Sequence, residues 1–275
     1  MKEKDIEDIE IRLLFEAIYQ RYGHDFRDYA NAFIKRRVRV VLETSDCKTI
    51  TEITLKVLTD ETFFQWFLFH FSITVTEWFR DPLFFKALRE KVLPYLKTFP
   101  FIKIWHAGCA TGEEAYSLAI LLKEEGLYDR ATIFATDFND DSLAKASRGI
   151  YPVKDIKAAS KCYRQTGGAH SLTGYFHAKY DSLIVDKSLK ENITFANFNL
   201  VTDGVFGEMH LILCRNVLIY FDKSLQNRVL SLFSESLLYR GFLSLGSKES
   251  LKFSKVRDQF DNFDNNKKIF QKTQR

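Results

Sequence analysis

A chain of 275 residues is long for a single hydrophobic core, so we expect one full-sized domain and a smaller one. Its 46% hydrophobic and 28% charged residues are typical of a globular protein. A net charge of +4 is too small to indicate a nucleic-acid partner by itself.

Cysteine spacing and the amino terminus favour a cytoplasmic protein. The four cysteines lie more than fifty residues apart: Cys47, Cys109, Cys162 and Cys214. This spacing suits neither a zinc motif nor a dense disulfide framework, so we expect reduced thiols. Residues 1–10 lack the apolar core of a signal peptide, and the apolar stretch 63–71 is too short to span a bilayer. No membrane anchor is expected, although a membrane partner stays open.

Residues 1–72 are predicted to form a small all-helical domain. Over residues 5–71 apolar side chains recur at spacings of three and four, as in Ile6, Ile9, Leu13 and Leu14, and strand patterns are nearly absent.

A strongly basic helix is predicted within this domain. Residues 27–42 carry five cations against one acid, and Lys35, Arg36 and Arg39 fall on the exposed arc of the helix. Such a face could bind an acidic helix, a phosphate backbone or an anionic membrane, or could simply be solvated. Aromatic residues do not alternate with the cations, which argues against single-stranded nucleic acid.

Strands alternate with helices in residues 73–275, which predicts an α/β doubly wound sheet with right-handed crossovers. The expected strands are 101–105, 131–136, 193–197, 211–213, 242–245 and 268–272, and the expected helices are 82–93, 113–125, 140–147 and 223–239. Pro94 should end or kink the first helix. Residues 160–190 break the alternation, and we expect a small β insertion there. In such sheets the ligand lies at the carboxyl ends of the strands.

A glycine turn follows the first strand, in the sequence Ala107-Gly-Cys-Ala-Thr-Gly-Glu-Glu114. Gly108 and Gly112 allow the backbone to approach a ligand closely. Acids at the start of the next helix, Glu113 and Glu114, would repel a pyrophosphate but suit the cationic end of S-adenosylmethionine. Alternatively, these acids merely complement the helix dipole.

Asp137 ends the second strand, where a carboxylate can accept both hydroxyl hydrogens of an adenosine ribose. The alternative role, capping the next helix, suits Asn139 or Asp140 better. Together with the glycine turn, Asp137 favours an adenosine-containing cofactor.

Several polar residues are candidates for the reacting end of the site. Arg80 has the planar fork of donors that a carboxylate requires, although a surface pair with Asp81 or a helix cap is the plainer interpretation. Arg215 and Asn216 follow a strongly apolar strand, and Tyr220 could offer a hydroxyl or serve as an interface aromatic. The pair Asn199-Leu200 is a weaker candidate of the same kind.

These motifs together resemble the CheR family of chemoreceptor glutamate methyltransferases over nearly the whole chain. The resemblance lies in residues 35–39, 73–82, 105–117, 135–137, 214–222 and 246–251. It implies a helical amino-terminal domain (1–72) before a Rossmann-like S-adenosylmethionine-dependent methyltransferase domain (73–275) with a small β-subdomain. It also implies methylation of glutamate side chains on the cytoplasmic helical domain of a chemoreceptor, giving S-adenosylhomocysteine as product.

The resemblance assigns roles to individual residues. The cofactor-binding set is Thr74, Thr76, Arg80, Gly108, Glu113, Asp137, Asn199, Leu200, Arg215 and Asn216. Arg80 and Tyr220 would flank the methyl-transfer centre. Lys35, Arg36 and Arg39 would contact the receptor, and the β-subdomain would hold a receptor carboxyl-terminal peptide in some members. Thr74 replaces a frequent Asn, and Ala115 replaces a usual Pro.

Methyl transfer to an ionised glutamate needs alignment and exclusion of water more than acid–base chemistry, so no essential base and no metal are expected. The six histidines show no metal-ligand spacing, and we expect a monomer.

Two alternative functions stay open. The first is a binding module without turnover, and Arg80 and Tyr220 argue against it. The second is a methyltransferase for nucleic acid, and the lack of a broad basic surface argues against it.

Overall fold

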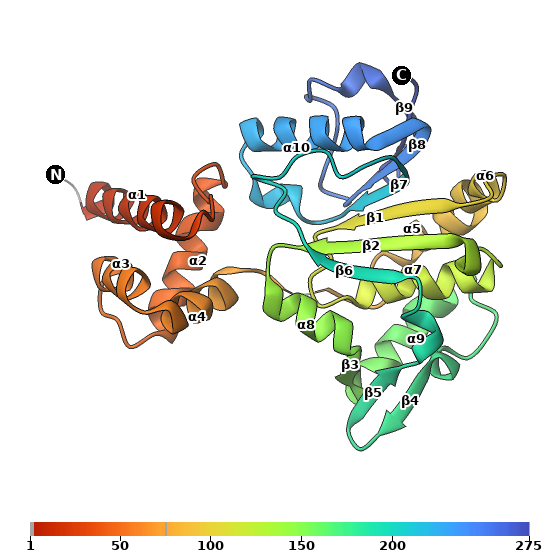
Figure 1. Cartoon of the computed structure of the whole chain (residues 1–275), viewed down its shortest axis with the longest axis horizontal. Helices are drawn as coiled ribbons and strands as arrows, with labels where there is room; N and C mark the ends of the chain where they lie inside the picture. Colours follow the sequence, from red (N-terminus) through yellow and green to blue (C-terminus); the bar gives the residue numbers. More distant parts are fainter. Residues whose placement is uncertain (1–2, 75, 275) are drawn as a thin grey trace. The chain divides into compact units, whose positions relative to one another are not determined.

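The computed structural model describes residues 3–74 and 76–274, which divide into two compact units (Figure 1). The first unit comprises residues 1–74 together with 219–228, and the second comprises residues 75–218 together with 229–275. Among the residues described, no helix combines the length and the apolar character that crossing a membrane requires.

Four helices form most of the first unit: α1 (Glu3–Tyr22), α2 (Asn31–Thr44), α3 (Ile50–Thr59) and α4 (Glu61–Phe71). Side-chain caps define two of the helix starts. The Thr49 side chain accepts a hydrogen bond from Glu52 N–H, and Asp60 accepts from the first turn of α4. Aromatic edge contacts fill the core, where the ring centroids of Phe15 and Phe71 are 5.3 Å apart.

A segment distant in sequence completes this helical unit. Tyr29 and Phe221 form an antiparallel bridge with their rings 5.0 Å apart, and Asp222 N–H donates to the Asp28 carbonyl at 2.9 Å. The bridging residues follow the 3-10 turn η6 (Leu218–Tyr220) and precede helix α10 (Lys223–Ser236). The helical unit therefore depends on residues more than 140 positions beyond its own helices.

The second unit contains a seven-stranded sheet with the order β6-β2-β1-β7-β8-β10-β9. Its strands are β1 (Ile102–Ala107), β2 (Ala131–Asp137), β6 (Ile193–Asn197), β7 (Met209–Cys214), β8 (Leu237–Leu245), β9 (Phe260–Asp264) and β10 (Ile269–Lys272). The first five in spatial order pair in parallel, as predicted, and β10 is antiparallel to both its neighbours. Strand β9 was missing from the prediction because Asn and Asp break its apolar pattern.

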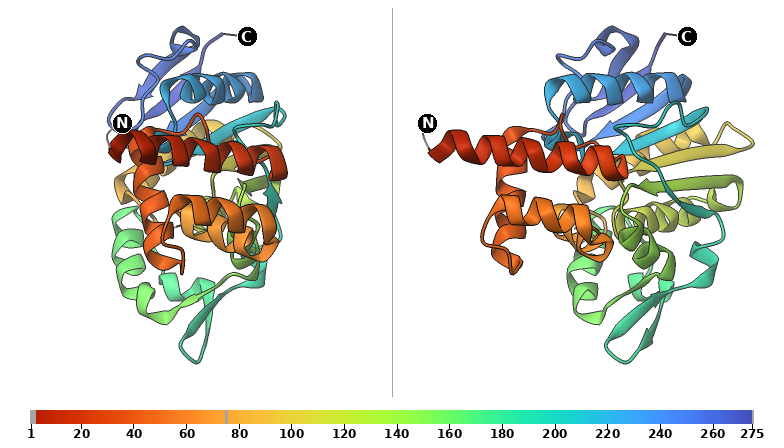
Figure 2. Two further views of the ribbon diagram at one scale, coloured as in Figure 1. Left: turned by 90° about the vertical axis from the view of Figure 1, so that its left-hand side faces the viewer. Right: turned by 60° about the vertical axis from the view of Figure 1, so that its left-hand side comes forward.

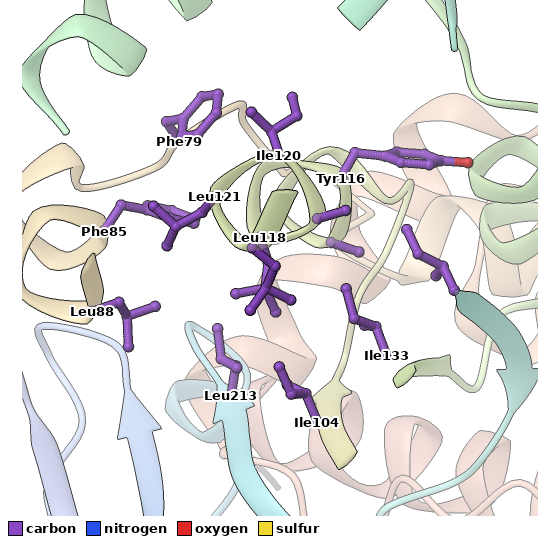
Figure 3. Packing of buried hydrophobic residues seen from close by; sticks show 14 of the residues in the cluster. Phe79, Phe85, Leu88, Ile104, Tyr116, Leu118, Ile120, Leu121, Ile133 and Leu213 are labelled. Carbon is purple, nitrogen blue, oxygen red and sulfur yellow. The ribbon is translucent and has the colours of Figure 1, made fainter. Parts of the chain in front are cut away.

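Helices cover both faces of this sheet. Figure 3 looks along α7 (Glu113–Glu124), with Leu118 directed toward Ile104 and Leu213 of the strands. On the other face Trp105 packs edge-on against Phe233 of α10, with ring centroids 5.3 Å apart. The side chains of consecutive residues of β1 thus pack on opposite faces of the sheet, because side chains alternate along a strand.

The predicted helix 223–239 runs too far. Helix α10 ends at Ser236, and β8 begins at once with Leu237. Leu237 pairs with Met209, and the register then shifts where Arg240 takes a φ of 62°. Pairing with a buried neighbouring strand outweighs the helical pattern of this short segment.

Of the two predicted effects of Pro94, ending or kinking its helix, the first does not occur. The chain continues from α5 (Pro82–Ala87) through the π-helix η1 (Leu88–Val92) into α6 (Leu93–Leu96). Leu93 N–H donates to the Leu88 carbonyl, five residues back. The wider turn accommodates the proline ring, which would otherwise clash with a carbonyl of the preceding turn.

A three-stranded antiparallel sheet forms the predicted β-subdomain, with the order β3-β5-β4. Its strands are β3 (Ile150–Pro152), β4 (Phe176–Lys179) and β5 (Ser182–Val185), which follow α8 (Asp140–Arg148). The subdomain begins about ten residues earlier than predicted, and it includes a helix, α9 (Ile156–Gln165), that the sequence pattern did not predict. Figure 2 shows the β4–β5 hairpin projecting away from the large sheet. Short 3-10 turns complete the second unit: η2 (Tyr128–Arg130), η3 (Val153–Asp155), η4 (Leu172–Tyr175), η5 (Lys187–Leu189) and η7 (Arg257–Gln259).

A cluster of half-buried charges joins the β-subdomain to the rest of the second unit. Arg89 of the π-helix pairs with Glu124 at 2.5 Å and with Glu125 at 2.7 Å. Glu124 also accepts hydrogen bonds from the hydroxyls of Tyr163 in α9 and Tyr175 in η4, which lie between β3 and β4. One carboxylate therefore links three parts of the chain.

Candidate active site

The glycine turn connects β1 to α7 and is tightly enclosed. Gly108 has a φ of 77°, and a Cβ there would lie 2.4 Å from Val217 Cγ2. Gly112 has a φ of 92°, and its Cβ would lie 2.8 Å from Ala146 Cβ. Both conformation and space therefore require glycine at these positions.

Asp137 holds this turn in place. Its Oδ2 accepts a hydrogen bond from Ala110 N–H at 2.9 Å, and its Oδ1 accepts from Asn139 N–H at 3.0 Å. Burial raises the pKa of the Asp137 carboxyl above its ordinary value, although these backbone donors oppose the shift. Asn139 caps α8, accepting from Ser142 N–H, so Asp137 is not the helix cap.

Glu113 lies buried at the start of α7, directly after Gly112. Its Oε2 accepts a hydrogen bond from the Thr111 hydroxyl at 2.6 Å. Burial raises the pKa of Glu113, and in the described ranges it forms no ion pair. An anionic side chain of this kind suits a cationic ligand group.

Tyr151 of the β-subdomain supports the same turn, because its hydroxyl donates to the Thr111 carbonyl at 2.6 Å. Sequence reasoning missed this residue. A tyrosine forty positions away in a short strand gives no local signal for such a contact.

Two acidic side chains hold the Arg215 guanidinium at the end of β7. Its Nη1 lies 2.7 Å from Glu114 Oε2, and its Nη2 lies 2.5 Å from Asp81 Oδ2. Nη1 also donates to the Arg80 carbonyl at 3.2 Å. Asp81 thus pairs with Arg215 and not with its neighbour Arg80.

Asn216 takes a left-handed conformation, with a φ of 62°. Its backbone N–H donates to Glu249 Oε2 at 3.0 Å, and Gly246 N–H donates to the same oxygen. The side-chain oxygen Oδ1 of Asn216 is buried and has no hydrogen-bond partner in the part of the chain that the structure describes. Such an orphaned acceptor is a candidate ligand contact.

The turn after β6 contains the remaining predicted contacts. Asn199 Oδ1 accepts from Val201 N–H at 3.0 Å, while Asn199 N–H donates to Asp203 Oδ2 at 2.8 Å. Leu200 is buried. Because β6, β2, β1 and β7 are parallel neighbours, their following turns lie along one edge of the sheet. That edge brings together Gly108, Glu113, Asp137, Asn199, Leu200, Arg215 and Asn216.

Thr76 and Arg80 also belong to the second unit, whereas Thr74 and Tyr220 belong to the first. Within the first unit the Tyr220 ring lies 4.7 Å from that of Phe33, and its carbonyl accepts from Ala30 N–H. Thr76 and Arg80 are half-buried.

The predicted basic face is partly neutralised within the helical unit. Lys35 pairs with Asp8, and Arg39 pairs with Glu7 at 2.9 Å. Arg36 is exposed and has no ion-pair partner over the described parts of the chain.

An open cavity of about 290 Å³ lies beside the Arg215 cluster in the second unit. Pro82, Phe84, Leu245 and Lys267 are among its lining residues. In the structure as described, no group of three or more His, Cys, Asp or Glu side chains is arranged to hold a metal ion.

Three features define the class of this protein: a mostly parallel sheet with an antiparallel β10, a glycine turn after β1 and an acidic residue that ends β2. The class is that of the S-adenosylmethionine-binding methyltransferases. Residues 74–269 match the model of the CheR methyltransferase SAM-binding domain, and residues 9–71 match that of the CheR all-alpha domain. The chain therefore belongs to the CheR methyltransferase family.

The chain is similar to several known proteins. The chain is 50% identical over 266 residues to Cher3 of Pseudomonas putida, provisionally named a methyltransferase, covering 97% of each chain. It is 29% identical to a chemotaxis protein methyltransferase of Borreliella burgdorferi, covering 90% of this chain and 89% of the other. Among solved structures, the N-methyltransferase NodS of Bradyrhizobium japonicum, bound to S-adenosylhomocysteine, is 13% identical with a TM-score of 0.35, covering 71% and 70%.

Proposed function

We propose that the protein methylates glutamate side chains in the cytoplasmic helical domain of a chemoreceptor, using S-adenosylmethionine as donor. Membership of a chemotaxis methyltransferase family supports the reaction class. The observation that carries the proposal is the buried acid Glu113 beside an enclosed glycine turn, at the edge where Asp137 and Asn216 also lie.

The residues at this edge fit the proposed cofactor. Glu113 offers a buried carboxylate for an amino group, and the Asn216 side chain offers an unused acceptor. Each carboxylate oxygen of Asp137 accepts one hydrogen bond from a backbone N–H group. Both oxygens therefore keep acceptor capacity for ribose hydroxyls. The set that we propose to bind the cofactor is completed by Thr74, Thr76, Arg80, Gly108, Asn199, Leu200 and Arg215.

When bound, S-adenosylmethionine supplies an electrophilic methyl group on a sulfonium centre. The chain's own task is to orient the acceptor carboxylate, for which we assign Arg80, with Tyr220 as a second donor. A glutamate is already ionised at neutral pH, so no residue needs to remove a proton.

We further propose that the protein acts as a cytoplasmic monomer. Lys35, Arg36 and Arg39 contact the receptor in this proposal, and the β-subdomain is a place for a receptor peptide. Neither nucleic acid nor membrane insertion enters this proposal.

The test uses tritiated S-adenosylmethionine with receptor-containing membranes. We expect base-labile label on the receptor, released as methanol, and loss of most of it with Arg80→Ala, while S-adenosylhomocysteine still binds. Label on nucleic acid, or base-stable label on protein, would reject the substrate. Full turnover by Arg80→Ala would remove that residue from the mechanism.

A further inference from the structure

The turn that carries Arg80 has an unusual backbone. Phe79 and Asp81, on either side of Arg80, both take left-handed conformations, with φ values of 50° and 57°. Neither residue is a glycine, and a bulky aromatic residue rarely adopts this conformation. Such a backbone persists only where the surrounding structure holds it.

One side of the turn is held from helix α7. Phe79 N–H donates to the Ser117 hydroxyl oxygen at 2.9 Å, and that hydroxyl donates to the Glu113 carbonyl at 2.7 Å. Both Phe79 and Ser117 are fully buried. Figure 3 shows the Phe79 ring beside α7, on the side away from the strands.

The other side of the turn is held by Arg215. Its guanidinium contacts the Arg80 carbonyl and the Asp81 carboxylate, and it lies 4.0 Å from the centroid of the Phe84 ring. Only 2% of the Arg215 side chain is exposed.

Glu114 anchors Arg215 from α7, one residue after the acid assigned to the cofactor. Burial alone would raise the pKa of Glu114, but Arg215 and then His106 hold it below its ordinary value. His106 Nε2 lies 3.4 Å from the second oxygen of Glu114. The carboxylate is therefore charged, and it keeps the Arg215 fork in one orientation.

We propose that Ser117, Glu114 and Arg215 are positioning residues that fix the Arg80 turn for methyl transfer. The three side chains act through the backbone on both sides of Arg80 and need not touch either reactant. This inference rests on the proposed role of Arg80. It gives the Arg215 side chain a positioning role in addition to its proposed place in the cofactor site.

The first experiment is a double-mutant cycle. Arg215→Lys keeps the charge but loses the planar fork, and we expect kcat to fall about 10- to 100-fold while the Kd for S-adenosylhomocysteine changes less than threefold. In an Arg80→Lys background, Arg215→Lys should lower the remaining kcat by less than about twofold. Equal losses in both backgrounds would overturn the proposal, because the two residues would then act independently.

Ser117→Ala is a milder variant that tests the other side of the turn. The matched control is Ser142→Ala, because Ser142 is equally buried but its hydroxyl has no hydrogen-bond partner in the described structure. We expect kcat to fall about tenfold for Ser117→Ala and to stay within twofold of wild type for Ser142→Ala. Equal effects from the two variants would contradict a positioning role.

Amide hydrogen exchange gives a readout that does not depend on the substrate. We expect residues 79–81 to exchange at least tenfold faster in Ser117→Ala and Arg215→Lys than in wild type, with β1 unchanged. Should the wild type fail to methylate receptors, the proposed function fails, and this exchange pattern still tests the turn. Unchanged exchange in both variants would overturn the positioning inference alone.

Discussion

Gly108 is where a single methyl group should have the clearest effect. Gly108→Ala places a Cβ against Val217, whereas Gly126, with a similar φ of 66°, has open space around it. Both alanine variants incur the cost of a left-handed residue, about 1 kcal/mol. We expect only Gly108→Ala to weaken S-adenosylhomocysteine binding, by about tenfold or more in calorimetry. Equal affinities for the two variants would contradict the close approach of this turn to the cofactor.

Glu113 predicts a pH dependence of cofactor binding. Because burial raises its pKa, the carboxyl becomes neutral at a higher pH than an ordinary glutamate does. Wild-type affinity for S-adenosylhomocysteine should therefore fall as the pH drops through this raised pKa. Glu113→Gln should bind about 10- to 100-fold more weakly at pH 7.5, because a charge-assisted hydrogen bond contributes about 1.5–3 kcal/mol. Calorimetry from pH 4.5 to 8 should show a nearly flat profile for this variant; a profile parallel to wild type would exclude Glu113.

The pKa of Glu113 also affects the stability of the fold, which should change with pH in the opposite direction to cofactor affinity. A carboxyl whose folded pKa is raised stabilises the fold at low pH and loses that contribution as the pH rises through the folded pKa. Glu113 therefore reduces stability at neutral pH in exchange for a charged site. Strained or costly residues of this kind mark functional sites.

Individual residues of the site were predictable only where the signal is local. Glycine, acid and strand end occur together in the sequence around Gly108 and at Asp137, so the position of these residues at the carboxyl ends of β1 and β2 was predictable. Arg215 and Glu114 are 101 residues apart, and nothing in the sequence around either one indicates the other. The pairing of a buried arginine with a distant acid is set by the crossing of strands and helices, which a local pattern does not contain.

Among the elements, the π-helix and its buried ion pairs make a prediction about stability. Arg89→Ala leaves the buried Glu124 carboxylate without its cation, and we expect a loss of about 3–5 kcal/mol in the free energy of unfolding. The control Lys86→Ala removes an exposed pair with Glu90 and should cost less than about 0.5 kcal/mol. Urea unfolding curves measure both, and a loss below 1 kcal/mol for Arg89→Ala would show that the cluster is not stabilising.

The type of an element, helix or strand, was predictable wherever its apolar residues follow a long and regular pattern, as in α7 or β1. The failures lie in short segments whose state depends on partners. Leu237 belongs to a strand because Met209 lies beside it, and Pro94 continues a helix because a π turn precedes it.

At the scale of the whole molecule, the charge of the helical unit predicts how the receptor is recognised. Arg36→Glu should raise the KM for receptor about 3- to 10-fold, because Arg36 is exposed and unpaired over the described ranges, whereas Arg39 already faces Glu7. The matched control is Lys252→Glu, the same charge change on an exposed residue between β8 and β9. Receptor methylation at increasing salt measures the effect, which screening should reduce. Equal changes in both variants would indicate a general charge effect and not a docking site.

The split helical unit also affects how the chain folds during synthesis. Its four helices leave the ribosome first, but the residues that cover Tyr29 and pair with Asp28 follow roughly 190 positions later. At ordinary rates of translation this leaves the aromatic core of the first unit incompletely covered for about 10 to 40 s. Nascent chains stalled before residue 219 should therefore bind chaperones that recognise exposed apolar surface, and release them once residue 228 has emerged.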